Sequence, residues 1–156
     1  MAEGIPVTRI EVPMSRINAI RDAVCRVTHL GDGPDASRLA CPEDAPALLA
    51  FLSDPAVHAP IYTLPRPLTE ASVETFITDH FAQRAEGEGL LFVRQDGDGA
   101  IVGYSDIQVW PHWAAGGLGG ALHPSLHHQG RGTAGAAMSF SWMFGALHLD
   151  LICETA

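Results

Sequence analysis

A glycine-containing turn at residues 129–134 has the composition of an anion-binding site. Gly130 and Gly132 can adopt backbone angles that other residues avoid, and they allow a ligand to approach the main chain. The small and apolar residues that follow predict a helix over residues 133–147. The first amides of a helix have no acceptor within it and lie at the positive end of its dipole. We therefore expect these amides to bind an anion, most naturally a phosphate, with Arg131 adding a charged contact.

One kind of phosphate site that matches these letters is that of dinucleotide-binding folds. Residues 130–135 satisfy G-x-G-x-x-G, and Glu154 follows at about the distance of the ribose-binding acid. That pattern requires a hydrophobic strand that runs directly into the first glycine. Residues 124–129 instead read Pro-Ser-Leu-His-His-Gln, which indicates a loop. A nucleotide-dependent oxidoreductase is therefore the disfavoured alternative.

A second pattern fits without this conflict. Residues 129–134 match Q-x-x-G-x-G/A, the pyrophosphate signature of the GNAT N-acetyltransferase superfamily, and residues 37–156 resemble that family. Residues 42–57 resemble the first helix of its ribosomal-protein N-terminal acetyltransferase branch. The resemblance implies an α/β fold with a mixed, mostly antiparallel twisted sheet, flanking helices and a splayed parallel strand pair at the cofactor site.

The activity that this resemblance implies is transfer of an acetyl group from acetyl-CoA to a primary amine, without a metal. The acceptor would be a small molecule or a peptide or protein N-terminus. The implied cofactor contacts are Leu122, Gln129, Gly130, Arg131, Gly132, Thr133 and Ala134. The sequence before this signature predicts a strand over residues 118–122, in which Gly119 and Gly120 indicate a bulge or a close approach by a ligand backbone.

Candidate catalytic groups lie next to this signature. By resemblance, and because a bulge would free them, the amides of Leu122 and His123 are the expected donors to the thioester oxygen. His123, with an ordinary pKa of about 6.5, is the candidate proton acceptor for an ammonium substrate. Glu154 is the candidate to act as base or to hold a cationic acceptor. The alternatives are a loop histidine and an exposed carboxylate at a strand end, neither with a special role.

Other patterns that could suggest chemistry have simpler interpretations. His123, His127 and His128 lack a carboxylate or cysteine that would complete a metal site. Asp96-Gly97-Asp98-Gly99 lacks the downstream glutamate of a calcium loop and predicts a hairpin turn. The aromatic residues within the helix over 133–147 have helical spacing and are expected in the core.

Composition bounds the class of protein. The 156 residues suit one domain with a real core, because 47% are hydrophobic and 17% are charged. Eighteen acidic residues against nine basic ones give a formal charge of −9, which disfavours nucleic-acid binding and favours a cationic partner such as an amine. Three scattered cysteines, no signal peptide and no membrane-spanning run lead us to expect a cytoplasmic protein with reduced thiols.

We divide the chain into an extension of unclear role (residues 1–35) and a GNAT-like domain (residues 36–156). Alternation predicts a strand over residues 7–12, and the spacing of Ile17, Ile20 and Val24 predicts an amphipathic helix. In the domain we expect strands over residues 36–40, 90–94, 101–110 and 149–155 and a helix over residues 42–53. The prolines of residues 59–67 predict an irregular segment, which by resemblance lies on the acceptor side. Thr69 is expected to cap a further helix whose apolar face carries Val73, Phe76, Ile77 and Phe81.

The sequence departs from the family after its last expected strand. A GNAT domain continues with a helix and two strands, and the helix often carries an asparagine and a tyrosine that protonates the CoA thiolate. This sequence ends at Ala156, and neither Tyr62 nor Tyr104 can be placed at the thiol. We expect impaired catalysis, with a non-catalytic acyl-CoA-binding or interaction module as the alternative. Either the N-terminal extension or a second chain would cover the vacant sheet edge, and the second case predicts a homo-oligomer.

Overall fold

A twisted sheet forms the centre of the molecule. The computed structural model describes residues 10–33, 36–127 and 129–154. Within them the strand order is β1-β2-β3-β4-β5-β6, with antiparallel neighbours except for the parallel pair β5 and β6. The expected mixed, mostly antiparallel α/β fold is confirmed. The strands are β1 (His29–Leu30), β2 (Ser37–Leu39), β3 (Gly89–Gln95), β4 (Ile101–Trp110), β5 (Ala115–Leu122) and β6 (Leu151–Cys153).

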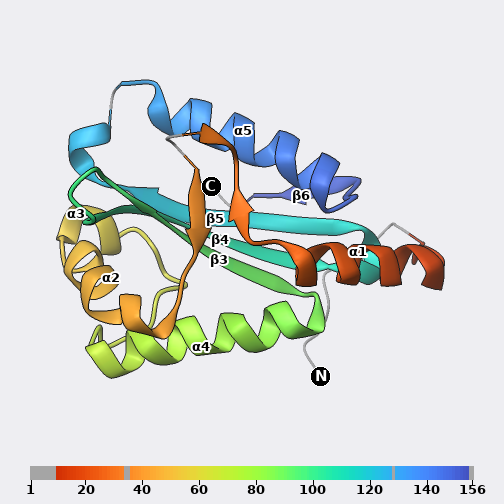
Figure 1. Cartoon of the computed structure of the whole chain (residues 1–156), viewed down its shortest axis with the longest axis horizontal. Coiled ribbons are helices and arrows are strands. Elements are labelled where there is room, and N and C mark those ends of the chain that lie inside the picture. The colour runs from red at the N-terminus through yellow and green to blue at the C-terminus, as the bar shows by residue number, and fades with distance from the viewer. Residues whose placement is uncertain (1–9, 34–35, 128, 155–156) are drawn as a thin grey trace.

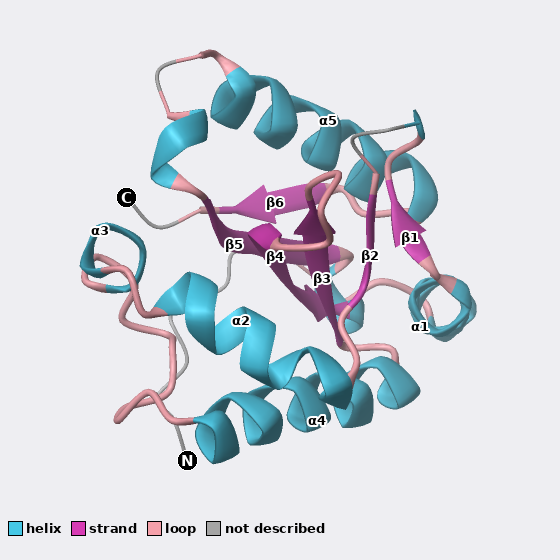
Figure 2. Cartoon of the chain, turned by 60° about the vertical axis from the view of Figure 1, so that its left-hand side comes forward, coloured by secondary structure: helices cyan, strands magenta, loops and turns pink. Residues whose placement is uncertain are grey.

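Helices cover both faces of this sheet (Figures 1 and 2). One face carries α2 and α4, and the other carries α1 and α5. The helices are α1 (Met14–Arg26), α2 (Ala45–Leu52), α3 (Pro55–His58), α4 (Glu70–Glu86) and α5 (Arg131–Ala146), with short 3-10 turns η2 (Pro42–Asp44), η3 (Pro111–Trp113) and η4 (Pro124–Leu126).

The core has two layers because β3 is apolar on both sides. Leu91 and Val93 pack towards α2 and α4, whereas Leu90 and Phe92 pack towards α1 and α5. A strand buried on both faces reads as a continuous apolar run, and residues 90–93 do so. The hairpin predicted at residues 96–99 joins β3 to β4, with the Asp96 carboxylate accepting the Asp98 and Ala100 amides at 2.9 and 3.0 Å.

The N-terminal extension contributes to this same core. The predicted helix is α1, and Ile20 and Val24 on it are fully buried. Arg16 on α1 donates to the His148 carbonyl at 3.0 Å and pairs with Asp150 at 2.5 Å, so the helix holds the segment before β6. The strand expected over residues 7–12 falls partly outside the described residues, and residues 10–12 form no regular element.

Of the two possibilities for the vacant sheet edge, coverage by the N-terminal extension is not what the structure shows. The strand β1 of the extension pairs with β2, at the opposite end of the sheet from β6. Within the described residues no strand pairs with the outer edge of β6. Pairing of that edge with a second chain stays a prediction.

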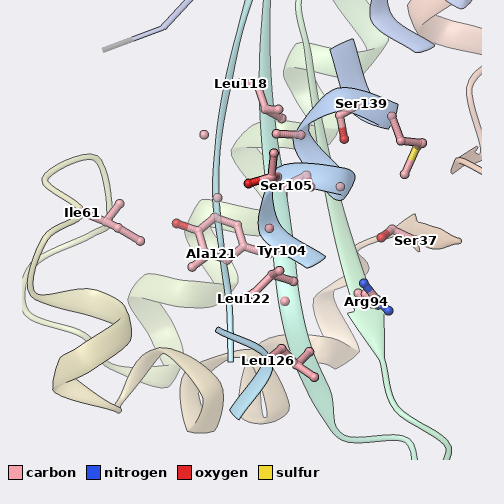
Figure 3. Close-up of a pocket in the computed structure, with 18 of the residues that line it drawn as sticks. Ser37, Ile61, Arg94, Tyr104, Ser105, Leu118, Ala121, Leu122, Leu126 and Ser139 are labelled. Carbon is pink, nitrogen blue, oxygen red and sulfur yellow. The ribbon is translucent and has the colours of Figure 1, made fainter. Parts of the chain in front are cut away.

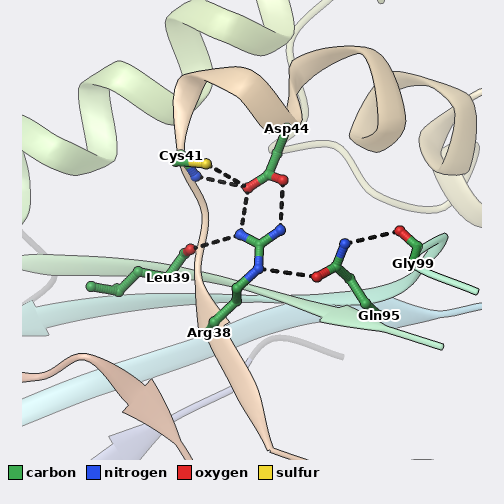
Figure 4. A network of polar contacts seen from close by, with 6 residues as sticks. All are labelled: Arg38, Leu39, Cys41, Asp44, Gln95 and Gly99. Atoms are coloured by element: carbon green, nitrogen blue, oxygen red, sulfur yellow. Dashed lines mark hydrogen bonds and ion pairs between the residues drawn. The ribbon is translucent and has the colours of Figure 1, made fainter. Parts of the chain in front are cut away.

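A polar network joins β2 to the start of α2 (Figure 4). Arg38 donates to both carboxylate oxygens of Asp44 at 2.7 Å, and Arg38 Nε donates to Gln95 Oε1 at 3.1 Å. The Cys41 amide also donates to Asp44, at 2.9 Å. Burial raises the pKa of Asp44, but these hydrogen bonds outweigh burial and hold the pKa below its ordinary value. The ionised carboxylate therefore stabilises the fold.

Replacing Asp44 by asparagine is expected to lower the free energy of unfolding by about 2 kcal/mol at pH 7. A carboxylate whose pKa is lowered by folding contributes stability above its unfolded pKa of about 3.9 and loses it as pH falls through the folded value. The difference between wild type and Asp44→Asn should therefore shrink below about pH 4. Urea unfolding at pH 7 and pH 3 measures it, with Asp98→Asn in the exposed hairpin as the control. A difference that does not change with pH would contradict this account.

Candidate cofactor and active site

The turn before α5 forms a backbone cradle of the expected kind. Gly130 caps the helix with φ of 70°, a left-handed conformation that favours glycine. The helix begins at Arg131, two residues earlier than predicted, so Gly132 and Thr133 belong to its first turn. Among the described residues none accepts a hydrogen bond from the amides of Gly132 or Thr133. These amides can bind an anion.

Three of the predicted contacts are not seen as free donors at the cradle: Ala134, Arg131 and Gln129. The Ala134 amide donates to the Gly130 carbonyl at 2.9 Å as the first bond of the helix, so its N–H is not one of the outward-pointing donors. The side chain of Arg131 lies outside what the structure describes, and its charged contact stays a prediction. Gln129 Nε2 donates to the Ser125 carbonyl at 3.0 Å, which closes the loop before the cradle.

The parallel pair β5 and β6 splays apart beside the cradle. The two strands pair only from Ala115 to Gly117, and β5 then continues to Leu122 without β6. The His123 amide donates to the Val102 carbonyl at 2.7 Å. Because hydrogen-bonding directions alternate along an antiparallel strand, the amides of Leu118, Gly120 and Leu122 face away from β4, towards the gap.

This alternation corrects one expected donor. The His123 amide is used by the ladder between β4 and β5, so it is not available to a thioester oxygen. The Leu122 amide faces the open side, as that role requires. At the other end of the gap, Glu154 Oε1 accepts the Leu118 amide at 3.0 Å, which places this carboxylate at the point where the two strands separate.

Glycine in β5 is required by the chain itself. The register between β4 and β5 runs without a shift, so the bulge expected at Gly119 and Gly120 does not occur in this ladder. Gly120 nevertheless has φ of 146°, and a Cβ at that position would lie 2.3 Å from the Tyr104 carbonyl oxygen. Glycine at position 120 therefore allows β4 to approach β5 closely.

A cavity of about 850 Å³ joins the cradle to the gap (Figure 3). Its walls come from the cradle, from β5, from the segment of residues 60–63 and from the underside of α5. Leu122, Gly130, Gly132 and Thr133 line it at one end, and Glu154 lines it beside the splayed pair. The segment of residues 60–63, expected on the acceptor side, forms one wall, with Ile61 opposite Tyr104 in Figure 3. The cavity thus brings most of the predicted site residues together.

Among the predicted site residues that the structure describes, His123, Gln129 and Ala134 do not line the cavity. The His123 ring packs against Phe51, with centroids 6.4 Å apart, and its Nδ1 accepts the Ser125 amide at 3.1 Å. Because Nδ1 is an acceptor, the neutral ring carries its proton on Nε2. The role of His123 as a base stays a prediction. His127 lines the cavity instead, with Nε2 donating to the Leu122 carbonyl at 3.0 Å.

An ion pair between α4 and β4 was missed by sequence reasoning. His80 on α4 is 7% exposed, whereas Phe81, predicted for the apolar face, is 41% exposed. His80 Nε2 donates to Asp106 Oδ1 at 2.8 Å and Nδ1 donates to the Phe76 carbonyl at 2.8 Å. Burial lowers the pKa of His80, but the hydrogen bond and charge of Asp106 outweigh burial and raise it above its ordinary value. Both ring nitrogens face acceptors, which is the arrangement that suits an imidazolium.

Asp106 in turn affects a residue of the cavity wall. It lies two residues from Tyr104 on β4 and opposite Gly119 on β5. Burial, with the charge of Asp106, raises the pKa of Tyr104 well above its ordinary value. Tyr104 therefore lines the cavity as a neutral phenol.

The sequence did carry a signal for the burial of His80. Its spacing of three residues from Ile77 and seven from Val73 places it on their face of the helix.

Among the described residues, no three histidine, cysteine or acidic side chains lie close enough together to hold a metal ion. None of the helices in this part of the chain combines the length and the apolar character that a membrane crossing requires.

Comparison with known families identifies the fold. Residues 38–156 match the family model described as "Acetyltransferase (GNAT) domain", which covers most of the chain. The chain belongs to the GNAT family. No curated protein is significantly similar to it in sequence. The cradle at Gly130–Thr133 and the splayed pair are therefore features of a GNAT domain in this chain.

Solved structures share this GNAT fold at low sequence identity. The ribosomal-protein-S5-alanine acetyltransferase from Vibrio fischeri has a TM-score of 0.69 and 17% identity, over 82% of this chain and 73% of that protein. A GNAT acetyltransferase from Bacillus anthracis has a TM-score of 0.64 and 18% identity, over 83% and 74%. RimJ from Mycobacterium smegmatis, in complex with CoA-disulfide, has a TM-score of 0.64 and 22% identity, over 78% and 61%.

Proposed function

We propose that this protein is an acetyl-CoA-dependent N-acetyltransferase that acts on a primary amine. The observation that carries the proposal is the single cavity that joins the first-turn amides of α5 to the unpaired edge of β5. Amides at Gly130–Thr133 would bind the diphosphate of the cofactor. The outward amides of Gly120 and Leu122 would pair with the extended arm that carries the thioester.

The reaction requires a neutral amine next to a polarised thioester. The amine nitrogen attacks the carbonyl carbon, a C–N bond forms and the C–S bond breaks. The sulfur leaves as a thiolate and takes up a proton, while the nitrogen loses one. The Leu122 amide would donate to the carbonyl oxygen, and Glu154 would hold the cationic acceptor or accept its proton. His123 would act as a hydrogen-bond donor through Nε2–H, or as a base at Nδ1 once the Ser125 amide no longer donates to that atom.

The support for an amine acceptor comes from the charge of the molecule and of the cavity. The sequence carries a formal charge of −9, and the Glu154 carboxylate lines the cavity where the strands separate. A free amine, a peptide N-terminus and a protein N-terminus share this cationic group. RimJ-like neighbours resemble this chain in fold only, so the choice among these acceptors is left to experiment.

A non-catalytic acyl-CoA-binding module is the second candidate. The observation that favours it is the engagement of both candidate catalytic side chains. Glu154 is bonded to the Leu118 amide, and Nδ1 of His123 is bonded to Ser125. A binding module needs only the cradle and the open strand edge.

Calorimetric titration with CoA, acetyl-CoA and NAD tests the ligand class. We expect CoA and acetyl-CoA to bind with dissociation constants in the micromolar range and NAD not to bind. Binding of NAD alone, or of none of the three, would refute the proposal. Release of free thiol from acetyl-CoA in the presence of primary amines and peptides with free N-termini then distinguishes an enzyme from a binding module.

A further inference from the structure

The first half of α5 does not pack directly on the sheet. Gly132, Gly135 and Ala136 line the cavity, and a Cβ added at Gly135 would meet no atom within 4 Å. The second half behaves differently, because Met143 and the following Leu147 are fully buried against the sheet. A trough therefore lies between the sheet and the first turns of α5.

The floor of this trough is one row of residues that crosses the sheet. Leu122 on β5 pairs with Gly103 on β4, and Gly103 pairs with Arg94 on β3. Ser37 on β2 pairs with Leu30 on β1. All five residues line the cavity, so the trough leads from the cradle side of β5 to the edge of the sheet at β1.

Four polar side chains face this trough. Arg94 and Ser37 lie close together in Figure 3, with Ser105 on the neighbouring strand and Ser139 on the helix opposite. Ser139 is only 5% exposed, and its hydroxyl has no hydrogen-bond partner among the described residues. Figure 3 shows this hydroxyl directed into the cavity. This hydroxyl is therefore able to donate to a group bound in the cavity.

The chemistry of this set is that of an anion site. Arg94 is the only arginine or lysine among the described residues that line the cavity, and three hydroxyls can donate beside it. A guanidinium with hydroxyl donors binds carboxylate and phosphate groups well.

We propose that Arg94, Ser37, Ser105 and Ser139 form a second anion-binding position for the ligand whose diphosphate lies on the α5 cradle. The proposal rests on the proposed function and extends it. The group bound there is a carboxylate or a phosphate. Its two possible sources are the terminal carboxylate of a dicarboxylic acyl group, such as succinyl, and the ribose 3′-phosphate of CoA. Binding at this position makes or breaks no covalent bond.

Calorimetric titration with two ligand pairs separates these sources. Succinyl-CoA against acetyl-CoA tests the acyl carboxylate, and CoA against dephospho-CoA tests the 3′-phosphate. We expect wild type to prefer the more anionic member of one pair by at least about tenfold. Arg94→Gln should remove that preference and leave the affinity for the less anionic member within about twofold. Ser139→Ala should reduce the same preference without a change of net charge.

Arg26→Gln, at the exposed end of α1, makes the same charge change away from the cavity and should preserve the preference. The proposal is overturned if wild type shows no preference within either pair. It is also overturned if Arg94→Gln and Arg26→Gln have the same effect. If Arg94→Gln does not fold, Ser139→Ala with unaltered preference overturns it. Failure of all four ligands to bind wild type would instead refute the proposed function.

Discussion

Replacing Gly132 by aspartate is expected to weaken CoA binding by at least about thirtyfold while leaving the protein folded. The added carboxylate would lie in the first turn of α5, where it repels the diphosphate at short range. The fold has room for it, because a Cβ at Gly132 meets only Leu122 Cδ1, at 4.0 Å. An acidic side chain in the first turn also interacts well with the helix dipole. Calorimetry measures the affinity, and a thermal melt shows that the melting temperature does not fall.

The matched control for this variant is Ser141→Asp. It places the same charge on the same helix, at an exposed position that does not line the cavity. Its CoA affinity should stay close to that of wild type. Equal affinities of Gly132→Asp and wild type would show that the cradle does not bind the diphosphate.

The largest expected loss of stability follows from replacing Gly120 by alanine. The residue has φ of 146°, and the new Cβ would lie 2.3 Å from the Tyr104 carbonyl oxygen, so β4 and β5 must move apart. Backbone strain and the steric conflict together should lower the free energy of unfolding by about 3 kcal/mol. Urea unfolding monitored by circular dichroism measures the change.

Gly119→Ala is the control for that experiment. The same strand then receives the same methyl group, but its nearest neighbours are the Asp106 carbonyl oxygen and Cβ, at 3.8 and 3.9 Å, which is ordinary contact. The free energy of unfolding should change by less than about 1 kcal/mol. If the two variants proved equally stable, the close approach at Gly120 would not constrain the sheet.

The parts of the fold that could be predicted from sequence are those with local signals. Apolar spacing located α1, the Asp-Gly turn located the hairpin, and the glycine signature located the cradle. The helix start was placed two residues late because the left-handed conformation of Gly130, which ends the preceding loop, is not visible in composition. Ser125 two residues after His123 was a local signal for the engaged ring, since such side chains often bond nearby groups.

The parts of the site that could not be predicted depend on contacts distant in sequence. Helical spacing places His80 on the buried face of α4, but its ion pair with Asp106, 26 residues away, has no local pattern that links the two residues. Arg94 and Ser37 share a trough because of strand register, which alternation alone does not specify between distant strands. The place of β1 at the far edge was likewise not deducible, because two residues give no periodicity.

A ligand bound in the trough beneath α5 would become part of the protein interior. The first turns of α5 line a cavity and do not rest directly on the sheet, and short helical stretches with little tertiary packing are marginal in water. A cofactor seated in the trough supplies the missing contact surface, so binding and ordering of these turns are coupled equilibria. At a concentration one hundred times its dissociation constant, any ligand specific for the folded state stabilises that state by about 2.7 kcal/mol. If CoA binds as proposed, we expect cofactor supply and conformational stability to be linked through this helix.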